Sequence, residues 1–248
     1  MVDGKIKSLK RAILFDLDGV IIDSMRCHSW TWAQAIREKL GIDISENYFL
    51  VNEGRNAKNL LMEIWQTHQV KLDKKQWQSV SDYRDEIFLS SFSPRLVPGA
   101  LELVQQLSEF GYDLGVATGS TRQVANEVLC QTGIRQFFSQ LVTSEDVHKS
   151  KPDPEPYELL LQRLEQHPKN ALVIENAPLG IQSALAANLI CLAVATTNEP
   201  EILSNATFVF NNLDEIRKYL NQDYGHNGGV GPWSFRLIME EHASQTGS

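Results

Sequence analysis

Cysteine is scarce in this chain: its 248 residues contain three, widely separated at Cys27, Cys130 and Cys191. An odd number, with no Cys-x-x-Cys pair and no Cys/His spacing, supports neither a disulfide framework nor a zinc site. Proteins of a reducing compartment keep such thiols reduced. We therefore expect a cytoplasmic protein in which the cysteines have structural roles.

Long apolar runs are missing as well. No stretch approaches the length of a membrane-spanning helix, which needs a run of about 18 apolar residues. The apolar run that follows the basic residues near the N-terminus is too short for a signal peptide and ends in acids. The sequence therefore predicts neither a membrane partner nor a secreted protein.

Positive charge is in short supply, with 23 Lys and Arg against 31 Asp and Glu, a net charge of −8. Nucleic-acid and anionic membrane surfaces attract proteins with clustered Lys and Arg, so we expect neither as a partner. A net negative charge does not exclude a local basic pocket that binds a small anionic substrate. The 42% hydrophobic content is ordinary for a folded domain, and we expect a monomer or a weak homodimer.

Short apolar runs alternate with helix-length amphipathic segments along most of the chain. The runs predict buried strands at 12–15, 114–117, 141–143, 171–174, 190–195 and 206–210. The intervening segments predict helices at 100–110, 122–130, 154–164 and 179–187. Strands and helices in alternation are typical of a Rossmann-like, doubly wound parallel sheet in the α/β class.

One interval interrupts this alternation. Between residues 24 and 94 the pattern is helical, with helices expected at 29–40, 57–68 and 74–92. The sequence therefore predicts an α/β core made of residues 1–23 and 95–220, with an all-helical insertion at 24–94. Residues 221–248 begin with a Gly-rich, turn-like stretch, and we expect a C-terminal extension that is either docked or flexible.

Residues that can carry chemistry follow four of the predicted strands. They are Asp16 and Asp18 after the first, Thr118-Gly119-Ser120 after the second, Lys151 after the third, and Glu175-Asn176 after the fourth. Ligands of open parallel sheets bind at the carboxyl ends of the strands. A single aspartate there is usually a helix cap, but four such groups at successive strand ends favour a binding site.

These groups suit phosphoryl transfer. The carboxylate of Asp16 can attack phosphorus, and Asp18, two residues later on the same side of the strand end, can act as general acid and base. Mg²⁺ prefers oxygen ligands such as Asp16 and the acid after the fourth strand. A hydroxyl group, backbone N–H groups and a lysine can hold the phosphate oxygens.

The chain resembles the haloacid dehalogenase superfamily, in the subgroup of β-phosphoglucomutase-like phosphatases. The resemblance rests on FDLDGVIIDS, VATGS, KSKPDPEPY and VIENAPLG, on their order and spacing, and on the helical insertion after the first motif. It implies that the insertion is a cap that closes over the site. It also implies an aspartyl-phosphate intermediate and Mg²⁺ as cofactor.

Carried over by motif, the resemblance gives a role to each candidate residue. The implied catalytic residues are Asp16, Asp18, Thr118 and Lys151; the implied substrate contacts are His28, Gly54, Arg55, Gly119 and Ser120; the implied metal ligands are Asp16, the Asp18 carbonyl, Glu175 and Asn176. His28 falls near the expected cap hinge, and Gly54-Arg55 falls on the expected specificity loop of the cap.

Two positions depart from the family pattern. The fourth motif usually reads Glu-Asp, whereas this chain has Glu175-Asn176, so we expect weaker metal binding than in the family. Mutases of the subgroup carry a lysine after the serine of the second motif, where this chain has Thr121 and then Arg122. The second departure argues against a mutase that handles bisphosphates, although Arg122 could take over the role of that lysine.

The sequence thus favours a Mg²⁺-dependent phosphatase that acts on a small phosphorylated metabolite, such as a sugar phosphate. A β-phosphoglucomutase-type phosphosugar mutase is the first alternative, because it shares the aspartyl-phosphate step. A non-catalytic protein that binds a phosphorylated ligand on the same fold is the second, and Asn176 is its support. A dehalogenase is disfavoured because that branch does not use the second acid, Asp18.

Overall fold

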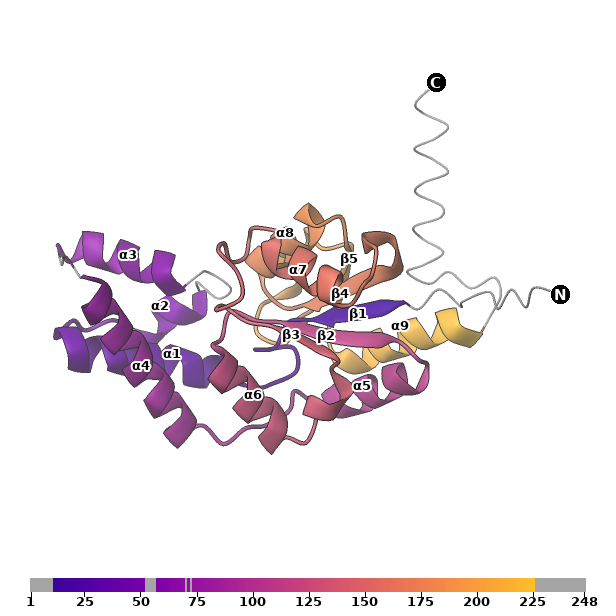
Figure 1. Ribbon diagram of the computed structural model, residues 1–248, viewed down its shortest axis with the longest axis horizontal. Helices are drawn as coiled ribbons and strands as arrows, with labels where there is room; N and C mark the ends of the chain where they lie inside the picture. Colours follow the sequence, from indigo (N-terminus) through magenta and orange to yellow (C-terminus); the bar gives the residue numbers. More distant parts are fainter. Residues whose placement is uncertain (1–10, 52–56, 70, 72, 226–248) are drawn as a thin grey trace, which may run out of the picture.

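The computed structural model describes residues 11–51, 57–69, 71 and 73–225, and a six-stranded parallel sheet lies at its centre (Figure 1). The strands are β1 (Ala12–Phe15), β2 (Asp113–Ala117), β3 (Gln140–Val142), β4 (Ala171–Glu175), β5 (Ile190–Val194) and β6 (Phe208–Phe210). Their order is β3-β2-β1-β4-β5-β6, so the winding direction reverses between β1 and β4. This doubly wound topology confirms the predicted α/β class and creates a crevice at the switch point.

Helices cover both faces of the sheet (Figure 1). They are α5 (Ala100–Glu109), α6 (Arg122–Gln131), α7 (Glu155–Arg163), α8 (Pro178–Ala186) and α9 (Leu213–Gly225). Successive strand side chains point to opposite faces, so Ile13 and Phe15 join the core under α5, α6 and α9. Leu14 joins the second core, under α7 and α8.

The predicted elements agree with the observed ones to within a few residues, but two α-helices among the described residues were not predicted. Helix α9 continues to Gly225, past residue 220, where we expected the core to end. A short helix, α2 (Glu46–Val51), lies where no element was predicted. Of the expected C-terminal extension, 221–248, the first five residues belong to α9, and residues 226–248 lie outside the described residues.

Four helices intervene between β1 and α5 and lie together at the end of the sheet where the strands terminate (Figure 1). They are α1 (Met25–Leu40), α2, α3 (Ala57–Thr67) and α4 (Lys74–Ser91). Buried residues of these helices, including Ile36, Leu61 and Val80, form a hydrophobic cluster separate from the two cores of the sheet. A hydrophobic core of its own is typical of a separate domain, as expected for an inserted cap.

The chain enters and leaves this helical segment through two backbone segments that lie side by side and are hydrogen-bonded to each other. The Asp23 N–H donates to the Arg95 carbonyl at 2.9 Å, and the Val97 N–H donates to the Ile21 carbonyl at 2.9 Å. These two hydrogen bonds lie next to the boundaries that we expect at 23/24 and 94/95. That these boundaries delimit a mobile cap stays a prediction.

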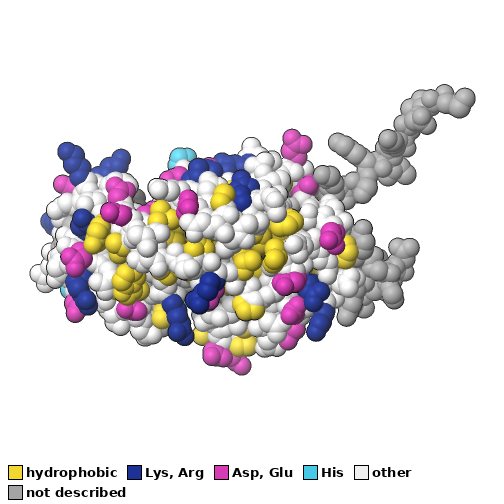
Figure 2. All heavy atoms as spheres, turned by 90° about the horizontal axis from the view of Figure 1, so that it is seen from below, with side chains coloured by type: hydrophobic (Ala, Val, Ile, Leu, Met, Phe, Trp, Pro, Cys, Tyr) yellow, Lys and Arg dark blue, Asp and Glu magenta, His cyan; other side chains and the backbone are white. Residues whose placement is uncertain are grey.

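The surface mixes charges of both signs. On the face in Figure 2, Lys and Arg side chains lie interspersed with Asp and Glu, with hydrophobic side chains showing between them. None of the helices in the described ranges combines the length and the hydrophobicity needed to cross a bilayer.

Candidate active site

A cavity of about 520 Å³ lies where the sheet meets the helical segment. The strand-end residues on its wall are Asp16, Asp18, Thr118, Gly119, Ser120, Lys151, Glu175 and Asn176. Helices α1 and α4 supply the opposite wall, including His28 and Arg84. The parallel register explains the convergence, because Phe15 pairs with both Val116 and Ile174, so the residues that follow all three reach the same edge.

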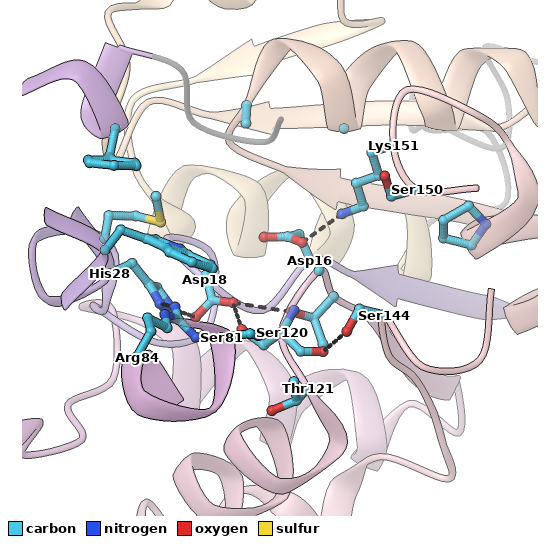
Figure 3. A pocket seen from close by; sticks show the side chains of 18 of the residues that line it. Asp16, Asp18, His28, Ser81, Arg84, Ser120, Thr121, Ser144, Ser150 and Lys151 are labelled. Carbon is cyan, nitrogen blue, oxygen red and sulfur yellow. Dashed lines mark hydrogen bonds and ion pairs between the residues drawn. The ribbon is translucent and has the colours of Figure 1, made fainter. Parts of the chain in front are cut away.

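Asp16 and Glu175 share one lysine (Figure 3 draws its bond to Asp16). The Lys151 ammonium donates to Asp16 Oδ1 at 2.6 Å and to Glu175 Oε1 at 2.6 Å. Tyr157, buried on α7, donates its hydroxyl to the same Oε1 at 2.6 Å. Lys151 also lies 4.9 Å from the centre of the Tyr157 ring. These contacts fix the ammonium beside the carboxylate that the sequence proposes as nucleophile.

Burial and charge act in opposite directions within this cluster. Burial raises the pKa of Asp16 to about 8; Lys151 opposes the rise, and the charges of Glu175 and Asp18 add to it. Burial alone would lower the pKa of Lys151, but Asp16 and Glu175 raise it above its usual value. The lysine is therefore a fixed cation beside Asp16, whose ionised form is disfavoured mainly by burial.

The position of Glu175 depends on a glycine in the next helix. Glu175 is 1% exposed, and its Oε2 accepts the backbone N–H of Asn176 at 3.0 Å. Gly180, on α8, lies directly against this carboxylate, and a Cβ at residue 180 would overlap the carboxylate carbon and both of its oxygens. Only glycine leaves room for an acid here, so the packing of α8 on β4 decides where Lys151 sits.

Asp18 points toward the helical segment, away from the lysine (Figure 3). Its carboxylate lies 2.7 Å from His28 Nε2 and accepts hydrogen bonds from Ser24 at 2.6 Å, Ser120 at 2.9 Å and Thr118 at 3.1 Å. Burial alone would raise the pKa of Asp18, but His28 and these hydrogen bonds hold it well below its usual range. Asp18 is therefore a carboxylate in this arrangement.

His28 connects Asp18 to helix α4. Its Nδ1 accepts a hydrogen bond from the Arg84 guanidinium, which can only donate, so the ring hydrogen must be on Nε2, facing Asp18. Burial lowers the pKa of His28; Asp18 opposes this shift and Arg84 adds to it. The ring also stacks on Phe88, with 4.4 Å between centroids. A neutral imidazole thus bridges the cap helix and the acid.

Helix α4 also contacts the second motif directly. Asp85 pairs with its neighbour Arg84 at 2.7 Å and accepts the Thr121 hydroxyl at 2.8 Å. Thr121 caps the start of α6, so an acid of the helical segment lies at the positive end of a core helix. Together with the link through His28, this contact joins the helical segment to the core beside the cavity.

The structure distributes the predicted site residues over two clusters. Lys151, Glu175 and Asp16 lie together; Thr118 and Ser120 contact Asp18 and not Lys151, and Gly119 lines the cavity beside them. Gly54 and Arg55 fall outside the described residues. Arg122, considered as a replacement for the mutase lysine, instead pairs with Asp146 at 2.5 Å and is not among the cavity-lining residues in the described part of the chain.

Asn176 lies at the metal position that the resemblance implies and is held by its neighbours. Its side-chain amide donates to the Thr197 hydroxyl at 2.8 Å, and its backbone carbonyl accepts from Asn198 at 3.0 Å. Within the described ranges, no three His, Cys, Asp or Glu side chains are grouped as a metal site. A metal here would therefore need oxygen donors of other kinds, such as a backbone carbonyl and an amide.

Sequence reasoning missed two buried polar residues of the site. Arg84 shares one face of α4 with Val80 and Phe88, at intervals of four residues, and Tyr157 shares a face of α7 with Leu160 and Leu161. A charged or phenolic residue in the apolar register of a helix was the available signal. This signal is weak, because Arg84 looks like an ordinary interruption of the hydrophobic stripe of its helix and Tyr157 looks like an ordinary member of one.

A family model described as haloacid dehalogenase-like hydrolase matches residues 13–194. The chain belongs to this family. The match spans both sides of the helical insertion and confirms the resemblance, and it makes the chain a hydrolase by family.

Two curated relatives of this family are named as phosphatases. Validoxylamine A 7'-phosphate phosphatase of Streptomyces hygroscopicus subsp. limoneus is 32% identical over 212 residues, covering 84% of this chain and 96% of the relative. Fructose-1-phosphate phosphatase YqaB of Escherichia coli is 26% identical over 177 residues, covering 71% and 92%. These relatives support a hydrolase of phosphate esters.

A solved structure from Bacteroides vulgatus, provisionally assigned as a beta-phosphoglucomutase, has the same fold. It superposes with a TM-score of 0.76 at 29% identity, covering 87% of this chain and 89% of that one. The superposition supports the Rossmann-like architecture and the β-phosphoglucomutase-like subgroup.

Proposed function

We propose that this protein is a Mg²⁺-dependent phosphatase that hydrolyses a small phosphorylated metabolite, of the sugar-phosphate kind, through an aspartyl-phosphate on Asp16. The observation that carries the proposal is the bond of 2.6 Å between Lys151 and Asp16 inside a cavity roofed by α1 and α4. The relatives named for validoxylamine A 7'-phosphate and fructose 1-phosphate support this substrate class.

In the first step, an oxygen of Asp16 forms a bond to phosphorus while the bond from phosphorus to the alcohol oxygen breaks. Lys151 lies where it can offset the charge of the transferring group. Asp18, a carboxylate in this arrangement, must first take up a proton, from solvent or from the attacking water of the preceding turnover, and it then gives that proton to the departing alcohol oxygen. In the second step, Asp18 takes a proton from the water that attacks phosphorus and releases Asp16. Asp18 is held as the carboxylate that this second step needs.

The oxygen donors at the strand ends suit Mg²⁺ as the partner of this chemistry. The carboxylate of Asp16, the backbone carbonyl of Asp18 and the amide oxygen of Asn176 would hold the ion, a set of hard ligands. Burial is the main cause of the raised pKa of Asp16, and the charges of Glu175 and Asp18 add to it, so a cation beside Asp16 would stabilise its carboxylate. When bound, Mg²⁺ would neutralise charge on the phosphoryl oxygens. Because Lys151 and Tyr157 already bond to Glu175, this acid would serve mainly to position the lysine.

A product assay tests the proposed function against its closest alternative. We expect the protein, incubated with β-glucose 1-phosphate, Mg²⁺ and a trace of the 1,6-bisphosphate, to release free phosphate as the main product. The physical reason is that Arg122 is engaged by Asp146 and does not line the described part of the cavity, so it does not hold a second phosphate. Glucose 6-phosphate as the main product would show a mutase instead.

Asn176→Asp is expected to tighten Mg²⁺ binding by about tenfold, because it adds a negative charge to a set of oxygen donors. Isothermal titration calorimetry with Mg²⁺ measures the change without relying on turnover. Asn170→Asp, which makes the same substitution at the opposite end of β4, is the matched control and should leave the affinity as it is. Equal affinities for wild type and Asn176→Asp would contradict Asn176 as a metal position.

A further inference from the structure

The wall of the cavity that faces the strand ends is apolar, and three of its four described apolar residues are aromatic. Helices α1, α2 and α4 supply Met25, Trp32, Phe49 and Trp77, here called the aromatic wall. Phe49 is buried in the hydrophobic cluster of the helices, but Trp32 and Trp77 are only half-buried. A half-buried indole beside a cavity keeps apolar surface available for a ligand.

The local structure holds both indoles in place. A capping box at Asp73 and Gln76 fixes the start of α4, and Trp77 follows it directly. Trp77 also packs edge to face on Trp65 of α3, with 5.3 Å between ring centroids. Trp32 lies under the Arg84 guanidinium at 5.1 Å. Two indoles held in this way form a preorganised surface, which costs little conformational entropy when a ligand binds.

The charge of this wall is internally balanced. Among its described lining residues, the charged side chains are Arg84 and Asp85, which pair with each other at 2.7 Å. Arg84 also donates to His28 and so has a structural task. The remaining polar groups, Ser29, Gln78 and Ser81, are neutral. A ligand with a second anionic group would meet no unengaged cation on the described part of this wall, whereas hydroxyl groups would find neutral partners.

We propose that the alcohol part of the substrate is an uncharged polyhydroxylated ring, a sugar or cyclitol, whose C–H face lies on Trp77 and Trp32. This proposal rests on the proposed function, because it places the phosphate at Asp16 and Lys151. A cavity of about 520 Å³ exceeds what a phosphate and a single ring fill, so it has room for a second ring. Trp77 is the residue that selects such rings over short or anionic phosphate esters.

The test compares four phosphate esters with the full-length, Mg²⁺-loaded protein: trehalose 6-phosphate, glucose 6-phosphate, glycerol 1-phosphate and 2-phosphoglycolate. We expect kcat/KM for the ring esters to exceed that for the other two by at least about tenfold. Trp77→Ala should reduce this preference by about tenfold, mainly by raising KM for the ring esters, since stacking holds substrate and transition state equally.

Two further variants keep the test decisive. Trp77→Leu preserves apolar packing against Trp65 but has no flat ring, so we expect it to lose the preference for ring esters as Trp77→Ala does. It replaces Trp77→Ala in the test if that variant folds poorly. Trp30→Ala removes a half-buried indole of α1 that is not among the cavity-lining residues described, and its preference should match that of the wild type.

The outcomes separate the two proposals. Hydrolysis of glycerol 1-phosphate or 2-phosphoglycolate as efficiently as the ring esters would overturn the ring proposal and leave the phosphatase intact. The same holds if Trp77→Leu keeps the full preference of the wild type. If none of the four esters were hydrolysed, the proposed function would fail. In that case, fluorescence titration with trehalose 6-phosphate would still decide whether the aromatic wall binds a ring, because Trp77→Leu should then weaken binding by about tenfold.

Discussion

Asp16→Asn is expected to abolish phosphate release from every phosphomonoester that the protein hydrolyses, with a fall in kcat of at least about a thousandfold. An amide is a far weaker nucleophile than a carboxylate, and it cannot form the aspartyl-phosphate. The replacement has nearly the same shape, and Lys151 keeps its bond to Glu175, so the fold around it should persist. Measuring inorganic phosphate release, with circular dichroism to check folding, tests this expectation.

The matched control is Asp214→Asn on α9, which makes the same exchange at an exposed acid that pairs only locally with Arg217 at 3.0 Å. Its kcat should stay within twofold of wild type, since a change at this exposed pair has only small energetic effects. Beryllofluoride with Mg²⁺ gives an independent reading, because an ordered adduct is expected on Asp16 in the wild type and not in Asp16→Asn. Normal turnover by Asp16→Asn would remove the basis of the proposed mechanism.

The sequence predicted the fold well because the signals are local and repeated. Each strand is a short apolar run, and most of the strands are followed by an amphipathic helix, so the alternation could be read without knowing the contacts. It also predicted that Asp16 and Lys151 would meet, although 135 residues separate them, because both follow strands of one parallel sheet. Two helices were not predicted: α2 has only six residues, too few to show a helical period, and α9 extends into the stretch after residue 220 that was assigned to the C-terminal extension.

The direction of each side chain within the site could not be predicted in the same way. Strand alternation suggested that Asp16 and Asp18 face the substrate together, and both line the cavity, but it did not predict the bonds of Asp18 to Ser24 and His28. Those bonds depend on how α1 packs against the core, which is tertiary information. The part played by Tyr157 depends similarly on how α7 packs against the sheet. The positions of these residues after the strands predict which of them share the site, but the contacts that each side chain makes depend on how the helices pack.

Gly180→Ala is expected to lower the free energy of unfolding by about 2–4 kcal/mol and to reduce kcat by at least about a hundredfold. In most helices, replacing a glycine by alanine is stabilising by about 1 kcal/mol, so the expected sign is the reverse of helix propensity. The reason is steric and electrostatic together: the new Cβ would overlap the Glu175 carboxylate. That carboxylate is buried and bonded to Lys151 and Tyr157, so it cannot move without breaking charged hydrogen bonds.

A double-mutant cycle separates this mechanism from a general sensitivity of α8. In a Glu175→Ala background the overlap is gone, so adding Gly180→Ala should leave the stability unchanged or raise it by up to about 1 kcal/mol. Urea denaturation of the wild type, both single variants and the double variant gives the coupling free energy directly. If Gly180→Ala destabilised both backgrounds equally, the clash would lie elsewhere on α8. A strong coupling would show that one missing methyl group at residue 180 sets the position of the acid, and through it that of the lysine beside Asp16.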